Sequence, residues 1–396
     1  MPGPLSDVRV LDLSRVLTGP FCSMMLADMG AEVIKVELPG RGDDTRQWGP
    51  PYLETESYYY LSVNRNKKSV ALNLKDPRGR EAVLKLAARS DVVLENFRPG
   101  TMDDLGLGYE TLRAVNPRLV YASITGFGPD GPYRDKVAYD LILQGMGGLM
   151  GITGEEGGAP VRIGVAIADI GAGMWTAYGI LAALHARERT GAGQKVETSL
   201  MDGQVAWMTY MAHLYFATGA SPGRMGSAHP TIVPYQAFRV KDGYINIAVG
   251  NDSFWVKFGR ALGLTAEVIA DSRFATNSAR ATHRQEVLDL IEPILATRGS
   301  REWLEALEQA GVPAGPIYTM EQLFSDPQVL HRSMVLDVPH PTLGSVRLTG
   351  IPLKLSETPG EVRTAPPLLG QHTEEVLTSL GYTREQLAAW KTDKVI

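Results

Sequence analysis

The stretch that decides the fold is residues 8–37, VRVLDLSRVLTGPFCSMMLADMGAEVIKVE. Its first six residues, 8–13, have the apolar character of a buried strand. A short hook then leads to Pro20, whose missing N–H costs nothing at a helix start, and Gly30 suits the helix end. Residues 31–37 form a second apolar strand. Strand, helix and strand in this order predict a right-handed βαβ unit.

The same alternation continues through the first half of the chain. A helix over 77–90 precedes a strand at 91–95, and residues 119–125 supply another strand, so we predict an α/β fold with a large, Rossmann-like open parallel sheet. The pattern differs later in the sequence, where paired strands and helices are typical of a small α+β unit. The predicted division is a large α/β domain over 1–200, a linker over 201–225, a small α+β domain over 226–325, and a linker and C-terminal part over 326–396 that returns to the large domain.

Composition restricts the function classes. Hydrophobic residues make up 44% and charged residues 21%, as in globular proteins, and the net charge of −5 disfavours nucleic acid as a partner. The single cysteine, Cys22, excludes an intramolecular disulfide and paired-cysteine metal sites. No signal-peptide pattern opens the sequence, and the apolar run 170–186 is too mixed to predict a membrane span. We therefore expect a cytoplasmic protein whose apolar run is a buried core helix.

Several catalytic signatures are missing from the sequence. The hook after the first strand holds only Gly19, so it lacks the glycine fingerprint of dinucleotide-binding enzymes. A phosphate-binding lysine loop, a His-Glu-x-x-His helix and a Gly-x-Ser-x-Gly turn are also missing. These absences disfavour nicotinamide enzymes, metal hydrolases and serine hydrolases, and we predict no metal site.

Asp169 follows an apolar run and begins a long predicted helix. One interpretation is an ordinary N-cap, a role that aspartate often has. A second is a reactive carboxylate, held anionic by the unpaired amides and the helix dipole, with Gly171 and Gly173 leaving space for a substrate. Both interpretations require the same position at the start of the helix.

Three further segments allow a structural and a functional interpretation. Residues 95–100 end a strand at the edge where α/β sheets bind ligands, but Asn96 and its neighbours also suit a plain turn. The charged run 64–69 is typical of a solvated turn, although the following residues could place Lys75 near a phosphate. Tyr58–Tyr60 suit packing, with hydroxyls able to touch an acyl group.

The sequence resembles the family III CoA-transferases, of the CaiB/BaiF type, over nearly its whole length. The motifs that carry the resemblance are LDLSRVLTGP at 11–20, GAEVIKVE at 30–37, ENFRPG at 95–100, LGLGY at 105–109 and SITGFG at 123–128, together with Asp169. Within the family it looks most like the succinyl-CoA:glutarate type, through GDDTRQWGPP at 42–51, YYLSVNRNKKS at 59–69, IVPYQAF at 232–238 and PLLGQH at 367–372. The resemblance implies a large domain built from both chain ends, a small middle domain and an interlocked homodimer.

The resemblance also implies roles for individual residues. Asp169 matches the family's nucleophile, and Tyr139 stands where the racemase branch has a histidine. Gly250 is the nearest counterpart of a glycine-rich loop that covers the active site of formyl-CoA transferase. The residues expected to line the CoA site are Val16, Leu17, Thr18, Leu72, Lys75, Asn96, Phe97 and Arg98.

The implied reaction moves CoA from an acyl-CoA, such as succinyl-CoA, to a dicarboxylate such as glutarate. It passes through an anhydride and a CoA thioester on Asp169, with CoA as co-substrate and no metal. An arginine suits the far carboxylate of a dicarboxylate, and Arg15, Arg46 and Arg162 are the candidates. The alternatives are an acyl-CoA racemase or epimerase of the same family and a non-catalytic CoA-binding protein.

Overall fold

The computed structural model describes residues 2–396 and contains two compact units. The first unit consists of residues 2–149, 163–212 and 327–396, and the second of residues 150–162 and 213–326. The range predicted as a linker, 201–225, contains most of α9 (Leu200–Trp207) and all of α10 (Thr209–Thr218).

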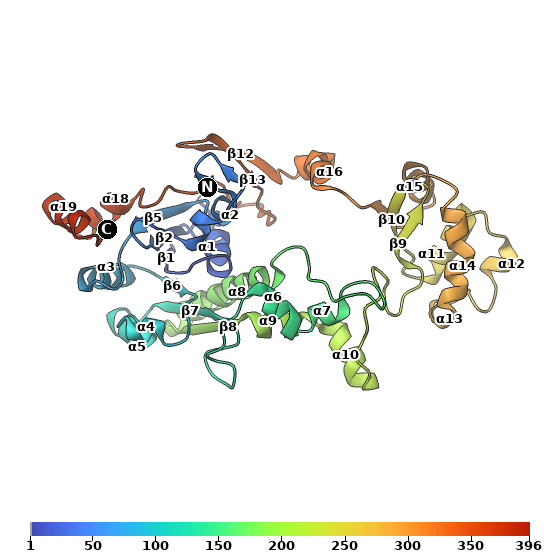
Figure 1. The fold of residues 1–396 in the computed structure, drawn as a ribbon, viewed down its shortest axis with the longest axis horizontal. Helices are drawn as coiled ribbons and strands as arrows, with labels where there is room; N and C mark the ends of the chain where they lie inside the picture. The colour runs from blue at the N-terminus through green and yellow to red at the C-terminus, as the bar shows by residue number, and fades with distance from the viewer. Residues whose placement is uncertain (1) are drawn as a thin grey trace. The chain divides into compact units, whose positions relative to one another are not determined.

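A six-stranded sheet organises the first unit, as the alternating sequence pattern predicts (Figure 1). The strand order is β5-β2-β1-β6-β7-β8, and every neighbouring pair is parallel. The strands are β1 (Arg9–Asp12), β2 (Glu32–Glu37), β5 (Lys67–Ala71), β6 (Val92–Glu95), β7 (Val120–Thr125) and β8 (Lys195–Ser199). A mixed α/β fold with a parallel sheet is therefore confirmed, and the carboxyl ends of β1, β2 and β6 lie at one edge of it.

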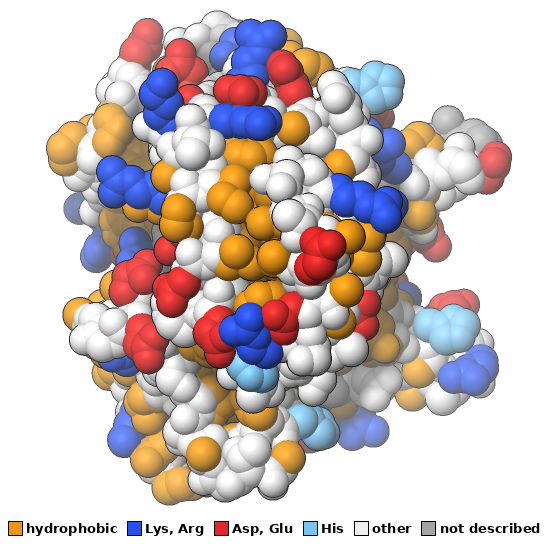
Figure 2. Space-filling view, turned by 90° about the vertical axis from the view of Figure 1, so that its right-hand side faces the viewer, with side chains coloured by type: hydrophobic (Ala, Val, Ile, Leu, Met, Phe, Trp, Pro, Cys, Tyr) orange, Lys and Arg blue, Asp and Glu red, His pale blue; other side chains and the backbone are white. Residues whose placement is uncertain are grey.

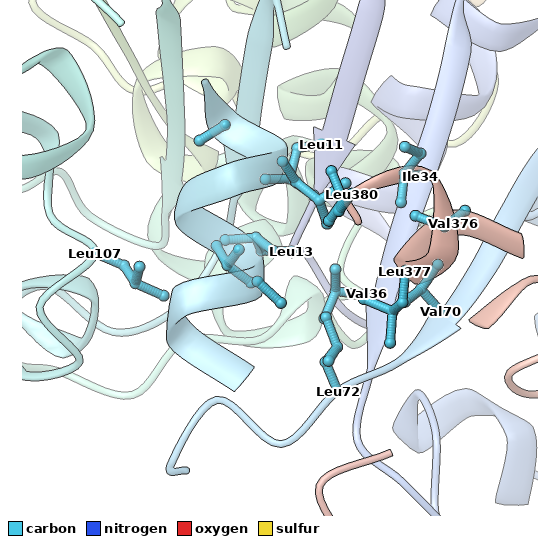
Figure 3. Close-up of a cluster of buried hydrophobic side chains, with 14 of the residues drawn as sticks. Leu11, Leu13, Ile34, Val36, Val70, Leu72, Leu107, Val376, Leu377 and Leu380 are labelled. Atoms are coloured by element: carbon cyan, nitrogen blue, oxygen red, sulfur yellow. The ribbon is translucent and has the colours of Figure 1, made fainter. Parts of the chain in front are cut away.

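Both faces of the sheet are covered. On one face, β1 and its neighbours pack against α1 (Thr18–Asp28) and α8 (Ile167–Thr190). On the other face, the strand side chains pack with α3 (Pro77–Ala87), α5 (Tyr109–Val115) and the C-terminal helices α18 (Thr373–Ser379) and α19 (Arg384–Thr392). Figure 3 shows side chains from both ends of the chain meeting there, Val376, Leu377 and Leu380 lying beside Leu11 and Val70.

Several shorter elements complete the first unit. They are the one-turn 3-10 helix at Asp44–Gln47, β3 (Tyr52–Leu53), β4 (Glu56–Ser57), α2 (Tyr58–Val63), α4 (Thr101–Asp104), α6 (Asp140–Met146), α17 (Pro327–His331), β12 (Val335–His340) and β13 (Gly344–Thr349). Helix α7 (Leu149–Ile152) has its first residue in the first unit and the others in the second. The hairpin of β12 and β13 lies in a stretch expected to be extended and proline-rich, and α19 was not predicted.

The charged run 64–69 is not a solvated turn, so that prediction is wrong. Asn64, Arg65, Lys67 and Ser69 are buried, and Lys67 begins β5. The two buried charges have buried partners: Arg65 pairs with Asp28 at 2.7 Å, and Lys67 donates to the carbonyl of Pro20 at 2.8 Å. Buried charges of this kind require such partners, and the sequence pattern alone does not show them.

The second unit has a three-stranded sheet with helices packed on it. Its strands are in the order β11-β10-β9, with β9 at Tyr235–Val240, β10 at Gly243–Ala248 and β11 at Ala314–Pro316. Its helices are α11 (Asp252–Ala261), α12 (Ala266–Ile269), α13 (Asn277–Thr282), α14 (Arg284–Leu295), α15 (Ser300–Gln309) and α16 (Met320–Ser325). Basic and acidic side chains are interspersed on the face drawn in Figure 2, which shows no continuous basic patch.

Helix α8 is longer than the apolar run that predicted it. By length and composition alone it could cross a membrane, a property that core helices of soluble proteins share. Half of its apolar window is buried, against α1, β7 and other parts of the first unit. Its packing agrees with the predicted core helix.

Candidate active site

Asp169 is the third residue of α8 and does not cap the helix, so the N-cap interpretation is wrong. The N-cap residue is Ala166, which has no side chain able to accept a hydrogen bond. The carboxylate of Asp140, from the start of α6, accepts the backbone N–H of Ala168 at 2.9 Å instead. A carboxylate from another helix therefore supplies the cap, and the Asp169 side chain is left for other contacts.

The first turn of α1 provides the partner of Asp169. The Thr18 hydroxyl donates a short hydrogen bond to Asp169 Oδ1. Among residues 2–396, no donor reaches the second oxygen, Oδ2. One carboxylate oxygen is thus fixed while the other remains available to react.

The surroundings of Asp169 bring its pKa close to neutral pH. Burial raises the pKa of Asp169 to about 6; the Thr18 hydrogen bond acts in the opposite direction, and the negative charge of Asp140 adds to the increase. At pH 7 a group with this pKa is mostly ionised, by roughly ten to one. Asp169 is therefore a partly buried carboxylate that is still charged under physiological conditions.

The glycines of α8 do not leave space for a substrate, contrary to expectation. A Cβ on Gly171 would lie 2.2 Å from the ring of Trp207, and a Cβ on Gly173 would lie 2.7 Å from the carbonyl oxygen of Thr18. Both glycines allow close packing, and Gly173 lets α1 approach α8 directly. This approach brings Thr18 to Asp169.

An apolar wall lies beside the carboxylate. Tyr59 packs against the buried cluster of Leu17, Met24 and Val63, and its ring meets Trp48 edge to face at 4.9 Å between centroids. Burial, followed by the negative charges of Asp169 and Asp140, raises the pKa of Tyr59 to about 12. Tyr59 therefore stays a neutral phenol next to the carboxylate.

The predicted CoA residues do not all lie in one place. A first group, Leu72, Lys75 and Phe97, lines a cavity of about 330 Å³. Arg15, predicted for the far carboxylate of the acid, lines the same cavity, and its guanidinium lies 5.3 Å from the centre of the Phe97 ring. Arg41 and Asp44, which the sequence analysis did not single out, line the same cavity. Its lining combines apolar side chains with four cationic residues, Arg15, Lys35, Arg41 and Lys75, and three acidic ones, Glu37, Asp43 and Asp44. Of these, the exposed Arg15 and Arg41 could meet the phosphates of a nucleotide.

The second group, Val16, Leu17 and Thr18, continues the same loop from Arg15 toward Asp169; the amide of Val16 donates to Asp43, which lines this cavity, and Thr18 contacts Asp169. Arg98 stands apart: it lines a different cavity of about 280 Å³ with Glu95, Arg134 and Lys195.

Asn96 is more than a turn residue. Its side chain accepts the N–H of Arg15 at 2.8 Å and donates to the Arg15 carbonyl at 2.7 Å, so it joins the two ligand-facing loops.

The structure removes one candidate for binding the far carboxylate. Arg46 donates to both oxygens of buried Glu37, at 2.7 and 2.8 Å, and stacks 3.6 Å from the centre of the Tyr60 ring. Its Nε and one terminal nitrogen are therefore already engaged, by Glu37 and the Pro367 carbonyl, and the side chain is nearly buried. Arg15, about half exposed and 3.5 Å from Asp44, keeps the freedom that such a role needs.

The remaining predicted residues are exposed or belong to the other unit. Tyr139 is 65% exposed, whereas the next residue, Asp140, is buried and faces α8. Asp140 was missed; the signal that could have found it is Gln144, one helical turn later, whose amide donates to Asp140 Oδ2 at 2.7 Å. Gly250 and Arg162 belong to the second unit. Residues 2–396 contain no group of three or more metal-ligating side chains.

Comparisons with known proteins agree on one family. Residues 5–373 match the family described as CoA-transferase family III. A relative from Mus musculus, described as a succinyl-CoA:glutarate CoA-transferase, is 46% identical over 94% of this chain and 86% of the relative. A relative from Chloroflexus aurantiacus, described as a succinyl-CoA–D-citramalate CoA-transferase, is 41% identical over 100% of this chain and 98% of the relative. The crystal structure of a CAIB/BAIF family protein from Brucella suis matches with a TM-score of 0.86 and 42% identity, over 96% of this chain and 100% of that one.

Proposed function

Because the chain belongs to CoA-transferase family III, and is therefore an enzyme that takes CoA as co-substrate, we propose that it transfers CoA from succinyl-CoA to glutarate with Asp169 as the nucleophile. The mouse relative supports the choice of both acids through its description. The observation that carries the role of Asp169 is its geometry: Thr18 fixes one oxygen, the other is open, and the pKa of about 6 leaves the group ionised at neutral pH.

The proposed reaction begins with attack of Asp169 Oδ2 on the thioester carbonyl of succinyl-CoA. The C–S bond breaks, CoA leaves as a thiolate, and a succinyl-aspartyl anhydride remains. The thiolate then attacks the aspartyl carbonyl, which releases succinate and forms an aspartyl-CoA thioester. This step divides a difficult exchange into easier ones.

The second half reverses these steps with the acceptor. A glutarate carboxylate attacks the aspartyl thioester and releases CoA thiolate, giving a glutaryl-aspartyl anhydride. The thiolate attacks the glutaryl carbonyl, so glutaryl-CoA leaves and the Asp169 carboxylate is restored. A thioester is exchanged for a thioester, and no proton is gained or lost overall.

The neighbours of Asp169 have separate tasks in this scheme. Thr18 orients the carboxylate, and its hydrogen bond favours the charged form. Tyr59 and Trp48 form an apolar wall that keeps water from the anhydride, which water would hydrolyse. Arg15 is our candidate for the far carboxylate of the dicarboxylate.

We also propose that the chain acts as an interlocked homodimer, in keeping with the family resemblance. Support comes from apolar side chains that the single chain leaves exposed on α8 and α9, including Met174, Leu181 and Val205, and above all Tyr178 at 69% exposed. Light scattering after size-exclusion chromatography tests this proposal, since a mass near 43 kDa would contradict it. We expect the protein to work in the cytoplasm, where succinyl-CoA would have to be supplied by another reaction.

The deciding experiment incubates the enzyme with succinyl-CoA and glutarate, and measures glutaryl-CoA by mass spectrometry. D-Citramalate serves as the competing acceptor. Glutaryl-CoA should form without ATP or metal, and borohydride or hydroxylamine should capture the aspartyl thioester at residue 169. Transfer to D-citramalate but not to glutarate would overturn the choice of acid. Full activity in Asp169→Asn would overturn the mechanism.

A further inference from the structure

The loop between β1 and α1 adopts a conformation that its sequence does not favour. Val16 has a φ of +69°, in the left-handed region that a β-branched residue rarely occupies. Such a conformation is strained and persists only where its surroundings hold it. The loop ends at Thr18, whose hydroxyl contacts Asp169. The position of that hydroxyl therefore depends on whatever holds Val16.

Buried charges hold this loop through its backbone. The Asp12 carboxylate accepts the N–H of Ser14 at 2.9 Å, and the Lys35 ammonium donates to the Ser14 carbonyl at 2.8 Å. The Asp43 carboxylate accepts the N–H of Val16, with both oxygens at 3.2 Å. The strained residue is thus anchored by Asp43 itself.

Lys35 and Asp43 form an ion pair with no solvent exposure on either side chain. Their charged atoms lie 2.9 Å apart. Burial opposes the charge on Asp43, but Lys35 and the Thr45 amide hold its pKa at about 2. A buried ion pair is seldom the cheapest way to stabilise a fold, because its desolvation offsets its attraction. A requirement for geometry explains its presence better than a requirement for stability.

The loop has little room to relax elsewhere. A Cβ on Gly19 would lie 2.2 Å from the Ser14 side chain, so the start of α1 is pressed against the loop. Asn96 brackets Arg15 from the other side. A shift of Val16 would therefore be transmitted to Thr18 rather than absorbed between them.

We propose that Asp43, paired with Lys35, is a positioning residue for the nucleophile, acting through the Val16 amide on the Thr18–Asp169 hydrogen bond. This inference rests on the proposed function of Asp169. It assigns a catalytic consequence to an ion pair at the carboxyl end of the sheet. Asp43 itself touches neither Asp169 nor the reacting atoms.

The main test uses Asp43→Asn and a matched control. Asp28→Asn also removes the charge of a buried ion pair in the same unit, because Asp28 pairs with Arg65 at 2.7 Å, but its side chain makes no contact with the loop. Asp43→Asn should lower kcat about 10-fold or more, as expected for loss of a hydrogen bond to a charged group. The kcat of Asp28→Asn should stay within about 3-fold of wild type, because this change lies away from the proposed active site.

A double-mutant cycle separates positioning from general damage. If Asp43 acts through Thr18, the double variant Asp43→Asn/Thr18→Val should have a kcat within about 3-fold of Thr18→Val alone, whereas adding Thr18→Val to Asp28→Asn should have its full effect. Multiplication of the two full effects in the Asp43 background would overturn the proposal. So would an equal loss in Asp28→Asn.

The pH profile gives an independent readout. Groups facing Asp169 are Thr18 from α1, Asp140 from α6 and Tyr59 from α2. Weakening the Thr18 bond removes a contact that favours the charged carboxylate, so the acid limb of kcat/KM should move to higher pH in Asp43→Asn and not in Asp28→Asn. An unmoved limb together with a lower kcat would indicate structural damage and contradict the proposal.

Thr45→Val covers the case in which Asp43→Asn does not fold. The Thr45 hydroxyl donates to Asp43 Oδ1 at 2.8 Å, so its removal loosens the carboxylate without leaving Lys35 unpaired. A smaller fall in kcat with the same upward pH shift is expected, and no change would reject the idea. If wild type fails to transfer CoA, or Asp169→Asn remains active, the proposed function fails; if only the Asp43 and Thr45 variants behave as wild type, this inference alone fails.

Discussion

Two consecutive helices of the first unit begin with the same arrangement and use it differently. Both α8 and α9 carry an aspartate as their third residue, Asp169 and Asp202. In α9 the rules of helix capping hold: the Ser199 hydroxyl accepts the N–H of Asp202 at 2.9 Å, and the Asp202 side chain is exposed. In α8 an alanine stands at the cap, and the carboxylate is partly buried against Thr18. The departure from local rules marks the site where the chemistry is expected.

The largest contrast should appear in activity. Asp169→Asn should lower kcat/KM for CoA transfer by at least about 10³-fold, because the amide cannot form the anhydride. Asp202→Asn, at the equivalent position of α9, should stay within about 2-fold because it touches no proposed reacting group. Steady-state kinetics with succinyl-CoA and glutarate compares the two, and similar losses would show that helix position, rather than environment, governs the effect.

Removal of the Thr18 hydroxyl should reduce the difference between the two helices, because Asp169 then loses its side-chain partner. A hydrogen bond to a charged group contributes about 1.5–3 kcal/mol, so Thr18→Val should lower kcat by roughly 10- to 100-fold. The acid limb of kcat/KM should also move up from about pH 6, because the lost bond favoured the charged form. Thr176→Val, a buried threonine of the same helix that bonds the Ala172 carbonyl, is the control. A Thr18 variant with wild-type kinetics would leave Asp169 without a defined partner.

Neutralising Asp140 should move the profile the other way. Asp140→Asn keeps an oxygen that can accept the Ala168 N–H but removes the negative charge that raises the pKa of Asp169. The acid limb should therefore shift below pH 6, with kcat within a few-fold of wild type. The pH dependence of single-turnover rates measures this shift. An acid limb that moves to higher pH instead would mean that Asp140 acts mainly as the helix cap.

The smallest effects should be on stability, with opposite signs at the two helices. Asp202→Asn removes a favourable charge at a helix start and should lower the free energy of unfolding by about 0.3–1 kcal/mol. Asp169→Asn should raise it at pH 7: the folded pKa of about 6 exceeds the unfolded value, so the ionised group opposes folding. Two pKa units correspond to about 3 kcal/mol, which partial exposure reduces to roughly 1–2 kcal/mol.

Melting temperatures at two pH values measure this difference. The ionised Asp169 penalises folding fully above pH 6, and the penalty is lost as the pH falls through the unfolded value of 3.8, so that by about pH 3 the carboxyl is mostly protonated in both states. The gain of Asp169→Asn over wild type should therefore disappear at about pH 3. A lower melting temperature than wild type at pH 7 would mean that the carboxylate supports the fold.

The sequence predicted those features that depend on neighbouring residues. The βαβ unit of 8–37 follows from apolar periodicity and from Pro20 and Gly30, and the six-stranded sheet continues the same pattern. The resemblance to the family adds Asp169 of α8, because its position relative to the family motifs distinguishes it from the other aspartates of the chain. All of these predictions depend either on residues close together in the sequence or on the family resemblance.

The remaining features depend on contacts between distant segments. Asp140 caps a helix that begins 27 residues later, and Thr18 reaches a carboxylate 151 residues away. The run 64–69 looks like a solvated turn until Asp28 and the Pro20 carbonyl are placed beside it. Gly171 and Gly173 looked like open space because the residues that fill it belong to other helices. Such errors arise where tertiary packing overrides local preference.

The joining of both chain ends in one core has a consequence for biosynthesis. Val395, next to the last residue, is fully buried, and its carbonyl accepts the N–H of Asn73 at 2.8 Å. A ribosome adding about 5–20 residues per second needs roughly 15–60 s to proceed from β6 to this residue. During that interval the face of the sheet that later receives α18 and α19 is uncovered in the nascent chain. Chaperone capture of stalled chains should therefore increase when the last dozen codons are removed, even though every proposed catalytic residue has already been translated.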